Sequence, residues 1–456
     1  MQRETVFDLI GVGFGPSNLS LAVRLAEEAG AADLAHCFIE RQPEFGWHRG
    51  MLLDDCRMQI SFLKDLVTQR DPKSRFTFIN YLFERGRLNE FVNLKSFYPT
   101  RVEFHDYLRW VADAFDKRVH YGETVTSIEP VHAAGKGGAI GSLRVFSRDG
   151  EGREWQRVTR ALSVGVGGTA QVPEAFAALG PHNVVHSSSY LTSIERVVGK
   201  PEEAKKRVAV IGAGQSAAEV FMDLSRRFAH VDASLVIRSG ALKPADDSPF
   251  VNEIFNPAYT DVVYAQPKDA RRTLIEGFRD TNYAVVDRPL IEQIYEMLYL
   301  QTVSDEPRHR LLANTAIEAA MRTANGQIEL TMRDRLTGHA RAERFDALVL
   351  ATGYRRDTHI ALLEGLAPHL GDALAEGNVA RDYRLATPGH FKPRIYLQGC
   401  CEDSHGLSDT LLSVLALRSD EIAASLLEHA TGDETISRNP ARQKNGVSGG
   451  RMAFAL

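Results

Sequence analysis

The segment from Phe7 to Glu40 places the strongest constraint on the fold of this chain. A short apolar run, Phe7 to Val12, predicts a buried strand, and glycines at alternate positions end it. A helical pattern follows at once in GPSNLSLAVRLAEE, and a second strand from Ala35 to Ile39 ends in an acid. Strand, glycine turn, helix, strand and acid at this spacing are typical of a dinucleotide-binding βαβ unit.

Each residue of this pattern has a physical role. The glycines allow a tight turn and let backbone N–H groups approach a pyrophosphate, where the dipole of the following helix favours negative charge. Pro16 suits the first helical turn, which needs no N–H from that residue. The acid, Glu40, would accept hydrogen bonds from an adenosine ribose. The predicted cofactor-binding residues are Gly11, Gly13, Gly15, Pro16 and Glu40. A glycine-rich turn in another α/β fold is the alternative.

A second pattern of the same kind begins at Arg207, in RVAVIGAGQSAAEVFMDLSRR. Gly212, Gly214 and Ala217 supply G-x-G-x-x-A between a strand and a helix. The next strand, Ala233 to Ile237, ends in Arg238 in place of an acid. An arginine there can pair with a 2′-phosphate, which favours NADP over NAD; a solvent-exposed base with no ligand is the alternative.

Two such patterns predict an α/β fold with two Rossmann-like domains, one for FAD and one for NADPH, and a helical substrate-binding portion. A strand from Phe345 to Leu350 leads into ATGYRRD and is expected to return the chain to the flavin domain. The expected boundaries are 1–200 and 340–430 for a discontinuous FAD domain and 201–339 for the NADPH domain, with substrate-site segments in 240–300. The polar segment 431–456 is expected to be a disordered tail.

Composition narrows the function. The chain has 456 residues, 44% of them hydrophobic, and a net charge of −5. This balance does not favour nucleic-acid binding, and no apolar run has the length of a membrane span. Four cysteines, at 37, 56, 400 and 401, form neither a CxxC motif nor a metal-ligand spacing, so we expect no metal and a cytoplasmic location.

Three flavoprotein classes share this layout. A disulfide reductase needs a redox cysteine pair, which the spacing disfavours. A Baeyer–Villiger or sulfur/amine monooxygenase carries the linker F-x-G-x-x-x-H-x-x-x-[YFW], of which only the end survives, from His186 to Tyr190. An N-hydroxylating monooxygenase is the third class.

The chain resembles the L-ornithine/L-lysine N-monooxygenases of siderophore biosynthesis, most closely the ornithine N5-hydroxylases. The matching segments run from residue 8 to about 413: DLIGVGFGPSNLSLA, MQISFLKDLVTQRDP, FVNLKSFYPTRVEFHDYLRWVA, VIGAGQSAAE, LKPADDSPFVNEIFNP, TNYAVVD, LATGYRRD and SHGLSDTLLS.

The resemblance implies roles for several further residues. Gln59 matches a glutamine beside the flavin, and Lys64 a lysine that binds the substrate carboxylate. Asn252, Asn282 and Ser413 match substrate-contacting residues, and Gln59, Lys64 and Asn282 are the expected catalytic set. The resemblance also places Val125, Thr410, Leu411 and Leu412 against FAD, and Gln215 and Ser216 against the nicotinamide nucleotide. Without the resemblance, each of these residues would be interpreted as an ordinary surface, capping or strand residue.

The implied reaction is N-hydroxylation of the ornithine side-chain amine by O2, through a C4a-hydroperoxyflavin formed after NADPH reduces FAD. The amine must first lose a proton, and no residue of the sequence stands out as its base. L-lysine, putrescine and cadaverine remain alternative substrates, because one methylene changes binding by only ~1–3 kcal/mol. An NADPH-dependent flavin reductase or oxidase, and a nucleotide-sensing protein without enzymatic activity, are further alternatives. The family resemblance also implies a homotetramer.

Overall fold

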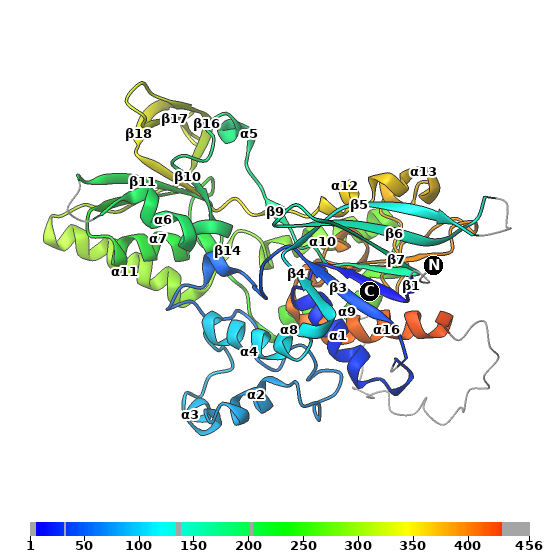
Figure 1. Ribbon diagram of the computed structural model, residues 1–456. Helices are drawn as coiled ribbons and strands as arrows, with labels where there is room; N and C mark the ends of the chain where they lie inside the picture. The colour runs from blue at the N-terminus through cyan, green and yellow to red at the C-terminus, as the bar shows by residue number, and fades with distance from the viewer. Residues whose placement is uncertain (1–5, 32, 134–137, 201–203, 431–456) are drawn as a thin grey trace.

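The computed structural model describes residues 6–31, 33–133, 138–200 and 204–430. Two five-stranded parallel sheets form the centres of two α/β units, and a helical lobe lies beside them (Figure 1). The predicted tail from residue 431 lies outside the described residues.

The first sheet is built around the first glycine pattern. Its strand order is β21-β8-β2-β3-β4, and every pair is parallel. The five strands are β2 (Leu9–Val12), β3 (His36–Glu40), β4 (Val119–Tyr121), β8 (Ala161–Val164) and β21 (Arg394–Leu397). Helix α1 (Pro16–Glu27) packs against the final helix α16 (Leu415–Ala430). The Phe7 to Val12 run divides in two, because β1 (Val6–Phe7) pairs with a different sheet from β2.

That other sheet is four-stranded and shares a core with the first one. Its order is β1-β7-β6-β5, with β5 (Glu123–His132), β6 (Ile140–Asp149) and β7 (Glu154–Thr159) forming an antiparallel meander. Short helices from a later part of the chain cover the same core: α12 (Thr358–Leu362), α13 (Ala367–Leu370) and α14 (Ala373–Glu376).

The second parallel sheet has the order β10-β19-β11-β12-β15. Its strands are β10 (Val184–His186), β11 (Lys206–Ile211), β12 (Val231–Val236), β15 (Arg310–Leu312) and β19 (Ala347–Leu350). Helices α6 (Tyr190–Val198), α7 (Gln215–Arg227) and α11 (Arg288–Ser304) share one core with it. On the other side are α5 (Glu174–Ala177) and the antiparallel strands β16 (Thr315–Arg322), β17 (Ile328–Asp334) and β18 (Ala340–Phe345).

The pairing of β10 and β19 corrects the expected domain boundaries. Both strands lie in the second sheet, where β19 pairs with β10 and β11. The sequence-based limits of 201 and 339 therefore cut through this sheet. The chain passes between the two units through an antiparallel pair, β9 (Thr169–Ala170) and β20 (Tyr354–Arg355), so it returns to the first unit one strand later than predicted.

The helical lobe comprises α2 (Phe78–Glu84), α3 (Leu88–Asn93) and α4 (Arg101–Asp113). Thr77 caps α2 by accepting a hydrogen bond from the Asn80 N–H, and Thr100 caps α4 by accepting one from the Glu103 N–H. The buried rings of Phe78, Phe104 and Tyr107 share one core with Leu19, Ala22 and Val23 of α1.

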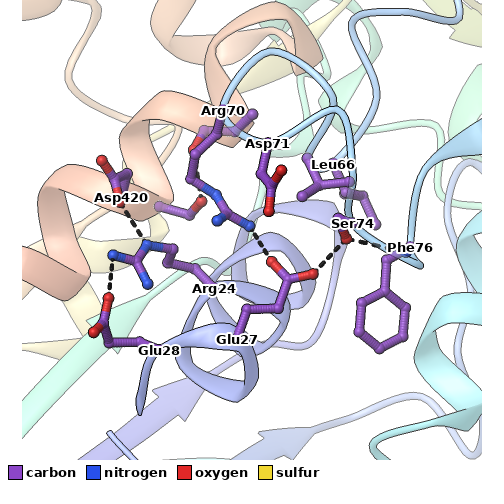
Figure 2. A network of polar contacts seen from close by, with 12 residues as sticks. Arg24, Glu27, Glu28, Leu66, Arg70, Asp71, Ser74, Phe76 and Asp420 are labelled. Atoms are coloured by element: carbon purple, nitrogen blue, oxygen red, sulfur yellow. Dashed lines mark hydrogen bonds and ion pairs between the residues drawn. The ribbon is translucent and has the colours of Figure 1, made fainter. Parts of the chain in front are cut away.

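Polar contacts also hold this lobe to α1 (Figure 2). Glu27 of α1 accepts hydrogen bonds from Arg70 and Ser74, and Ser74 Oγ accepts one from the Phe76 N–H at 3.0 Å. One turn earlier on α1, Arg24 pairs with Glu28 at 2.7 Å and with Asp420 of α16. Helix α1 is thus fixed on two sides, which sets the position of its N-terminus and of the glycine turn.

Between β12 and β15 the chain forms β13 (Lys243–Pro244), α8 (Pro249–Asn252), α9 (Tyr259–Tyr264), α10 (Lys268–Gly277) and β14 (Val285–Val286). Near the end of the chain lies α15 (Glu402–His405), followed by the 3-10 helices η8 (Leu407–Thr410) and η9 (Leu412–Val414). Helices α9 and α10 pack against α15, so the insert bridges the two units.

Candidate active site

The first glycine turn has the geometry that a dinucleotide requires. Gly13 has a φ of +83°, and a Cβ at this position would lie 2.5 Å from the Gly165 carbonyl oxygen, so only glycine fits. A Cβ on Gly15 would meet no atom within 4 Å, which leaves room before the N-terminus of α1. Pro16 occupies the first turn of α1, as predicted.

Glu40 is buried at the end of β3 and already has two backbone donors. Its carboxylate accepts hydrogen bonds from the N–H of Phe14 at 2.7 Å and of Gln42 at 2.9 Å. It therefore holds the glycine turn in place. A carboxylate has about four acceptor positions, so two remain for ribose hydroxyls.

A buried amide network, which sequence reasoning missed, supports the same turn. Asn18 Nδ2 donates to the Gly13 carbonyl at 2.7 Å, and its Oδ1 accepts from Ser163 Oγ at 2.6 Å and from Gln398 Nε2 at 2.9 Å. The network joins the carboxyl ends of β2, β8 and β21. The only sign in the sequence is a polar residue on the buried face of α1.

The segment after α15 lies against the start of α1. Arg418 donates to the Asp409 carboxylate at 3.0 Å and to Ser17 Oγ at 2.9 Å, and both charged side chains are almost fully buried. Thr410, Leu411 and Leu412 follow Asp409, where η8 ends and η9 begins. The buried hydroxyl of Ser413 has no hydrogen-bond partner among the described residues, which suits a ligand contact.

Val125 lies near the start of β5, half-buried against the first core. No contact to the glycine turn identifies it as a ligand residue, so its assignment stays a prediction.

The second glycine turn repeats the design of the first. Gly212 has a φ of +148°, and a Cβ there would lie 2.3 Å from the Ala351 carbonyl and 3.3 Å from the Cβ of Ala217. Small residues at both positions therefore let β11, β19 and α7 approach closely. Gln215 and Ser216 form the first turn of α7, beyond Gly214.

A chain of polar contacts joins the two units beside this turn. Gln59 Nε2 donates to Asp287 Oδ1 at 3.0 Å, and the Asp287 N–H donates to Gln215 Oε1 at 2.8 Å. Gln215 Nε2 then donates to Glu219 at 3.0 Å, and Glu219 forms a two-pronged ion pair with Arg101 at 2.9 and 2.7 Å. Burial raises the pKa of the Asp287 carboxyl, and the Gln59 amide opposes that shift. Gln59 of the first unit thus lies close to Gln215 of the second.

The sequence reasoning predicted Gln59 and Gln215 but missed Asp287, Glu219 and Arg101. Asp287 stands in the matching segment TNYAVVD, and Glu219 stands in VIGAGQSAAE. Arg101 stands in FVNLKSFYPTRVEFHDYLRWVA. Nothing in one sequence indicates that these three segments meet.

The segments that carry the predicted substrate residues converge near η8. Lys64 is half-buried: burial lowers the pKa of its ammonium, and the nearby carboxylate of Glu253 raises it. Asn252 precedes Glu253, and its amide donates to the Asp247 carbonyl at 2.7 Å. The 3-10 helix η5 (Glu253–Phe255) packs against η8, and Tyr283, next to Asn282, hydrogen-bonds to Glu402 of α15. Lys64, Asn252 and Asn282 therefore lie on segments packed around the same region as Thr410.

Arg238 is exposed directly beyond β12, where the sequence predicts it. Among the described residues, no carboxylate forms an ion pair with its guanidinium. Its backbone carbonyl accepts a hydrogen bond from Arg335 Nη1 at 2.8 Å.

These observations define a class of protein: an α/β protein with two dinucleotide-binding turns and a polar site between its units. No group of three or more His, Cys, Asp or Glu residues that could hold a metal ion occurs among the described residues. In the same part of the chain, no helix has the length and apolar character to cross a membrane.

Comparison with known proteins places the chain within that class. The family model described as L-lysine 6-monooxygenase/L-ornithine 5-monooxygenase matches residues 5–356, and the chain belongs to this family. It is 79% identical over 406 residues to an L-ornithine N(5)-monooxygenase of Burkholderia cepacia, covering 89% of this chain and 91% of that protein.

Solved structures agree. The ornithine hydroxylase PvdA from Pseudomonas aeruginosa superposes with a TM-score of 0.87 at 48% identity, over 93% of this chain and all of that chain. The ornithine N-hydroxylase KtzI from Kutzneria sp. 744, solved with reduced FAD, NADP+ and L-ornithine, gives a TM-score of 0.86 at 37% identity, with the same coverage. The predicted family and fold class are confirmed.

Proposed function

We propose that this protein is an L-ornithine N5-monooxygenase that uses FAD, NADPH and O2. The observation that carries the proposal is the position of Lys64, Asn252 and Asn282 on segments that meet beside η8. Family membership and the 79% identical ornithine monooxygenase support the same substrate.

FAD is assigned to the first unit. Gly11, Gly13, Gly15 and Pro16 would cradle its pyrophosphate, Glu40 would bind its ribose, and Val125 would lie at its adenine end. Thr410, Leu411, Leu412 and Gln59 would surround the isoalloxazine ring. When bound, FAD supplies the redox chemistry with O2.

NADPH is assigned to the second unit. Gly212, Gly214 and Ala217 shape its turn, Gln215 and Ser216 start the helix at its pyrophosphate, and Arg238 would bind its 2′-phosphate. The hydrogen bonds that join Gln59 through Asp287 to Gln215 support a nucleotide position close to the proposed flavin site.

The substrate contacts follow from charge. The Lys64 ammonium would pair with the ornithine carboxylate, and the amides of Asn252 and Asn282 with the hydroxyl of Ser413 would bind the amino acid without adding charge. The reacting amine needs its lone pair, and burial between the units favours the neutral form. The overall reaction is balanced in atoms and charge. One substrate ammonium ion, one NADPH and one O2 give one hydroxylamine, one NADP+ and one water, and the proton released by the ammonium is consumed.

The test is NADPH oxidation in the presence of FAD, with L-ornithine, L-lysine or putrescine, scored together with the hydroxylamine formed. We expect hydroxylamine equal to the NADPH consumed with ornithine alone. Product only with lysine or the diamine would overturn the substrate. Peroxide with every amine would identify an NADPH oxidase.

We further propose that the product enters hydroxamate siderophore biosynthesis, and that the enzyme acts in the cytoplasm as a homotetramer. The resemblance to the siderophore family supports the pathway and the homotetramer, and the cysteine pattern supports the cytoplasmic location. Size-exclusion chromatography with light scattering tests the homotetramer.

A further inference from the structure

Two arginines with no acidic partner stand side by side at the carboxyl end of β12. Arg238 and Arg335 are both exposed, and neither forms an ion pair with any described residue. Other arginines of the same sheets do: Arg310 pairs with Glu343, Arg333 with Glu318, and Arg344 with Glu329. Arg238 and Arg335 are joined by a hydrogen bond and have no carboxylate partner among the described residues, so together they form a candidate site for an anionic ligand.

Backbone hydrogen bonds hold the two arginines together. The Asn314 N–H donates to the Ser239 carbonyl at 2.9 Å, and the Arg335 N–H donates to the Asn314 carbonyl at 2.8 Å. The Arg335 guanidinium then returns to the Arg238 carbonyl, also at 2.8 Å. Asn314 has a φ of +50°, in the left-handed region, so the chain turns sharply between β15 and β16 to reach this position. The turn after β17 is thereby joined to the loop after β12.

The remaining hydrogen-bond donors are free for a ligand. Arg335 uses one N–H on the Arg238 carbonyl, which leaves four of its five donors. Among the described residues, the neighbouring Asp334 forms no ion pair with Arg335; its Oδ1 accepts the N–H groups of Leu336 and Thr337 at 2.8 Å within the turn. A second guanidinium beside the first can bind a phosphate dianion with paired N–H donors, which one arginine alone does less well.

We infer that Arg335 is a second arginine, together with Arg238, that binds the 2′-phosphate of NADPH and so determines the preference for NADPH over NADH. The inference rests on the proposed NADPH dependence. It assigns a role to the turn between β17 and β18, a segment outside both glycine patterns.

The test compares Arg335→Gln with Arg344→Gln, an arginine of the same three-stranded sheet that is paired with Glu329. Steady-state kinetics with NADPH and with NADH give one readout, and calorimetric binding of adenosine 2′,5′-bisphosphate gives a second that needs no turnover. For R335Q we expect the KM for NADPH and the Kd for the bisphosphate to rise by about 10- to 100-fold, as for loss of hydrogen bonds between charged groups. Values for NADH should change less than twofold, and R335K should recover part of the loss.

Two results would overturn the inference: an unchanged KM for NADPH in R335Q, or an equal loss for NADPH and NADH, which would indicate a structural role. R344Q should behave as the wild type in every measurement. Failure of the proposed function is distinguishable, because the wild-type enzyme would then show no preference for NADPH before any substitution is made.

Discussion

At the scale of the residue, the site consists of polar groups whose partners inside the protein leave part of their capacity free. Lys64 lies half-buried near a single carboxylate, that of Glu253, and Ser413 has a buried hydroxyl with no partner among the described residues. Unmet capacity of this kind is costly in a folded protein unless a ligand meets it. Lys64 and Ser413 have different roles, because the Lys64 ammonium selects a carboxylate and the Ser413 hydroxyl does not.

Replacing Lys64 with Met should therefore weaken ornithine use selectively. Loss of one charge-assisted contact is worth about 1.5–3 kcal/mol, so kcat/KM for ornithine should fall about 10- to 100-fold. Putrescine lacks the carboxylate, so the rate of NADPH oxidation measured with it, for which no hydroxylamine is expected, should not fall. Lys73→Met, at an exposed lysine of the same segment, is the control. An equal fall for both amines would contradict the carboxylate contact.

His405 makes stability depend on pH. Burial lowers the pKa of its imidazole to about 4, and two weaker effects oppose that shift: the nearby Asp409 carboxylate and the hydrogen bond from Nε2 to the Arg381 carbonyl at 3.3 Å. An unfolded histidine has a pKa of about 6.5. The folded pKa is the lower one, so the stabilisation is complete above pH 6.5 and is lost as the pH falls towards 4. At pH 5 the loss is about 2 kcal/mol.

The measurement is the unfolding free energy from urea titration at pH 7 and pH 5, followed by the fluorescence of released FAD. In His405→Gln the difference between the two pH values should be smaller than in the wild type by about 2 kcal/mol. A change at the exposed His390 serves as the control. An unaltered pH dependence in H405Q would show that another group carries it.

At the scale of the element, the sequence predicted what local chemistry determines. Both strand–turn–helix units and the Pro16 start of α1 appear where the residue patterns place them. The assignment of β10 and β19 to a sheet did not follow, because an apolar strand of four residues carries no information about which sheet it will join. Contacts between segments far apart in the sequence could not be predicted either. Asp287 and Arg101 acquire their roles only when three such segments meet.

The contacts of α1 in Figure 2 give a prediction at this scale. Arg70→Met would remove the charged partner of Glu27, whose side chain is only 20% exposed, and should cost about 1–3 kcal/mol of stability. Arg109→Met, at an arginine 54% exposed, should change stability by less than about 0.5 kcal/mol. Thermal unfolding at pH 7 measures both.

The double variant E27Q/R70M distinguishes an ion pair from lost packing. If the cost arises from an unpaired carboxylate, the double variant should be more stable than the sum of the single changes predicts, because no charge is left without a partner. Strict additivity would mean that the two side chains contribute independently.

At the scale of the whole molecule, two nucleotide units must act on one substrate, so their relative placement matters as much as either fold. The line of hydrogen bonds and ion pairs from Gln59 to Arg101 is a polar connection between the second glycine turn and the first unit. Its strongest part is the pair between Arg101 and Glu219, whose side chains are 12% and 2% exposed. Breaking such a pair leaves a buried cation without its partner.

Glu219→Gln should therefore affect transfer between the units more than either unit alone. We expect flavin reduction by NADPH to slow at least tenfold, because Glu219 also holds the Gln215 amide, while reduction of bound FAD by dithionite keeps its wild-type rate. Stability should fall by up to about 3 kcal/mol.

Glu195→Gln is the matched control, since Glu195 pairs with Arg227 at 3.6 Å but is 76% exposed. Stopped-flow absorbance follows both reactions. Equal slowing by NADPH and dithionite would place the defect in the flavin unit, and an unchanged NADPH rate would mean that the pair does not align the two nucleotides.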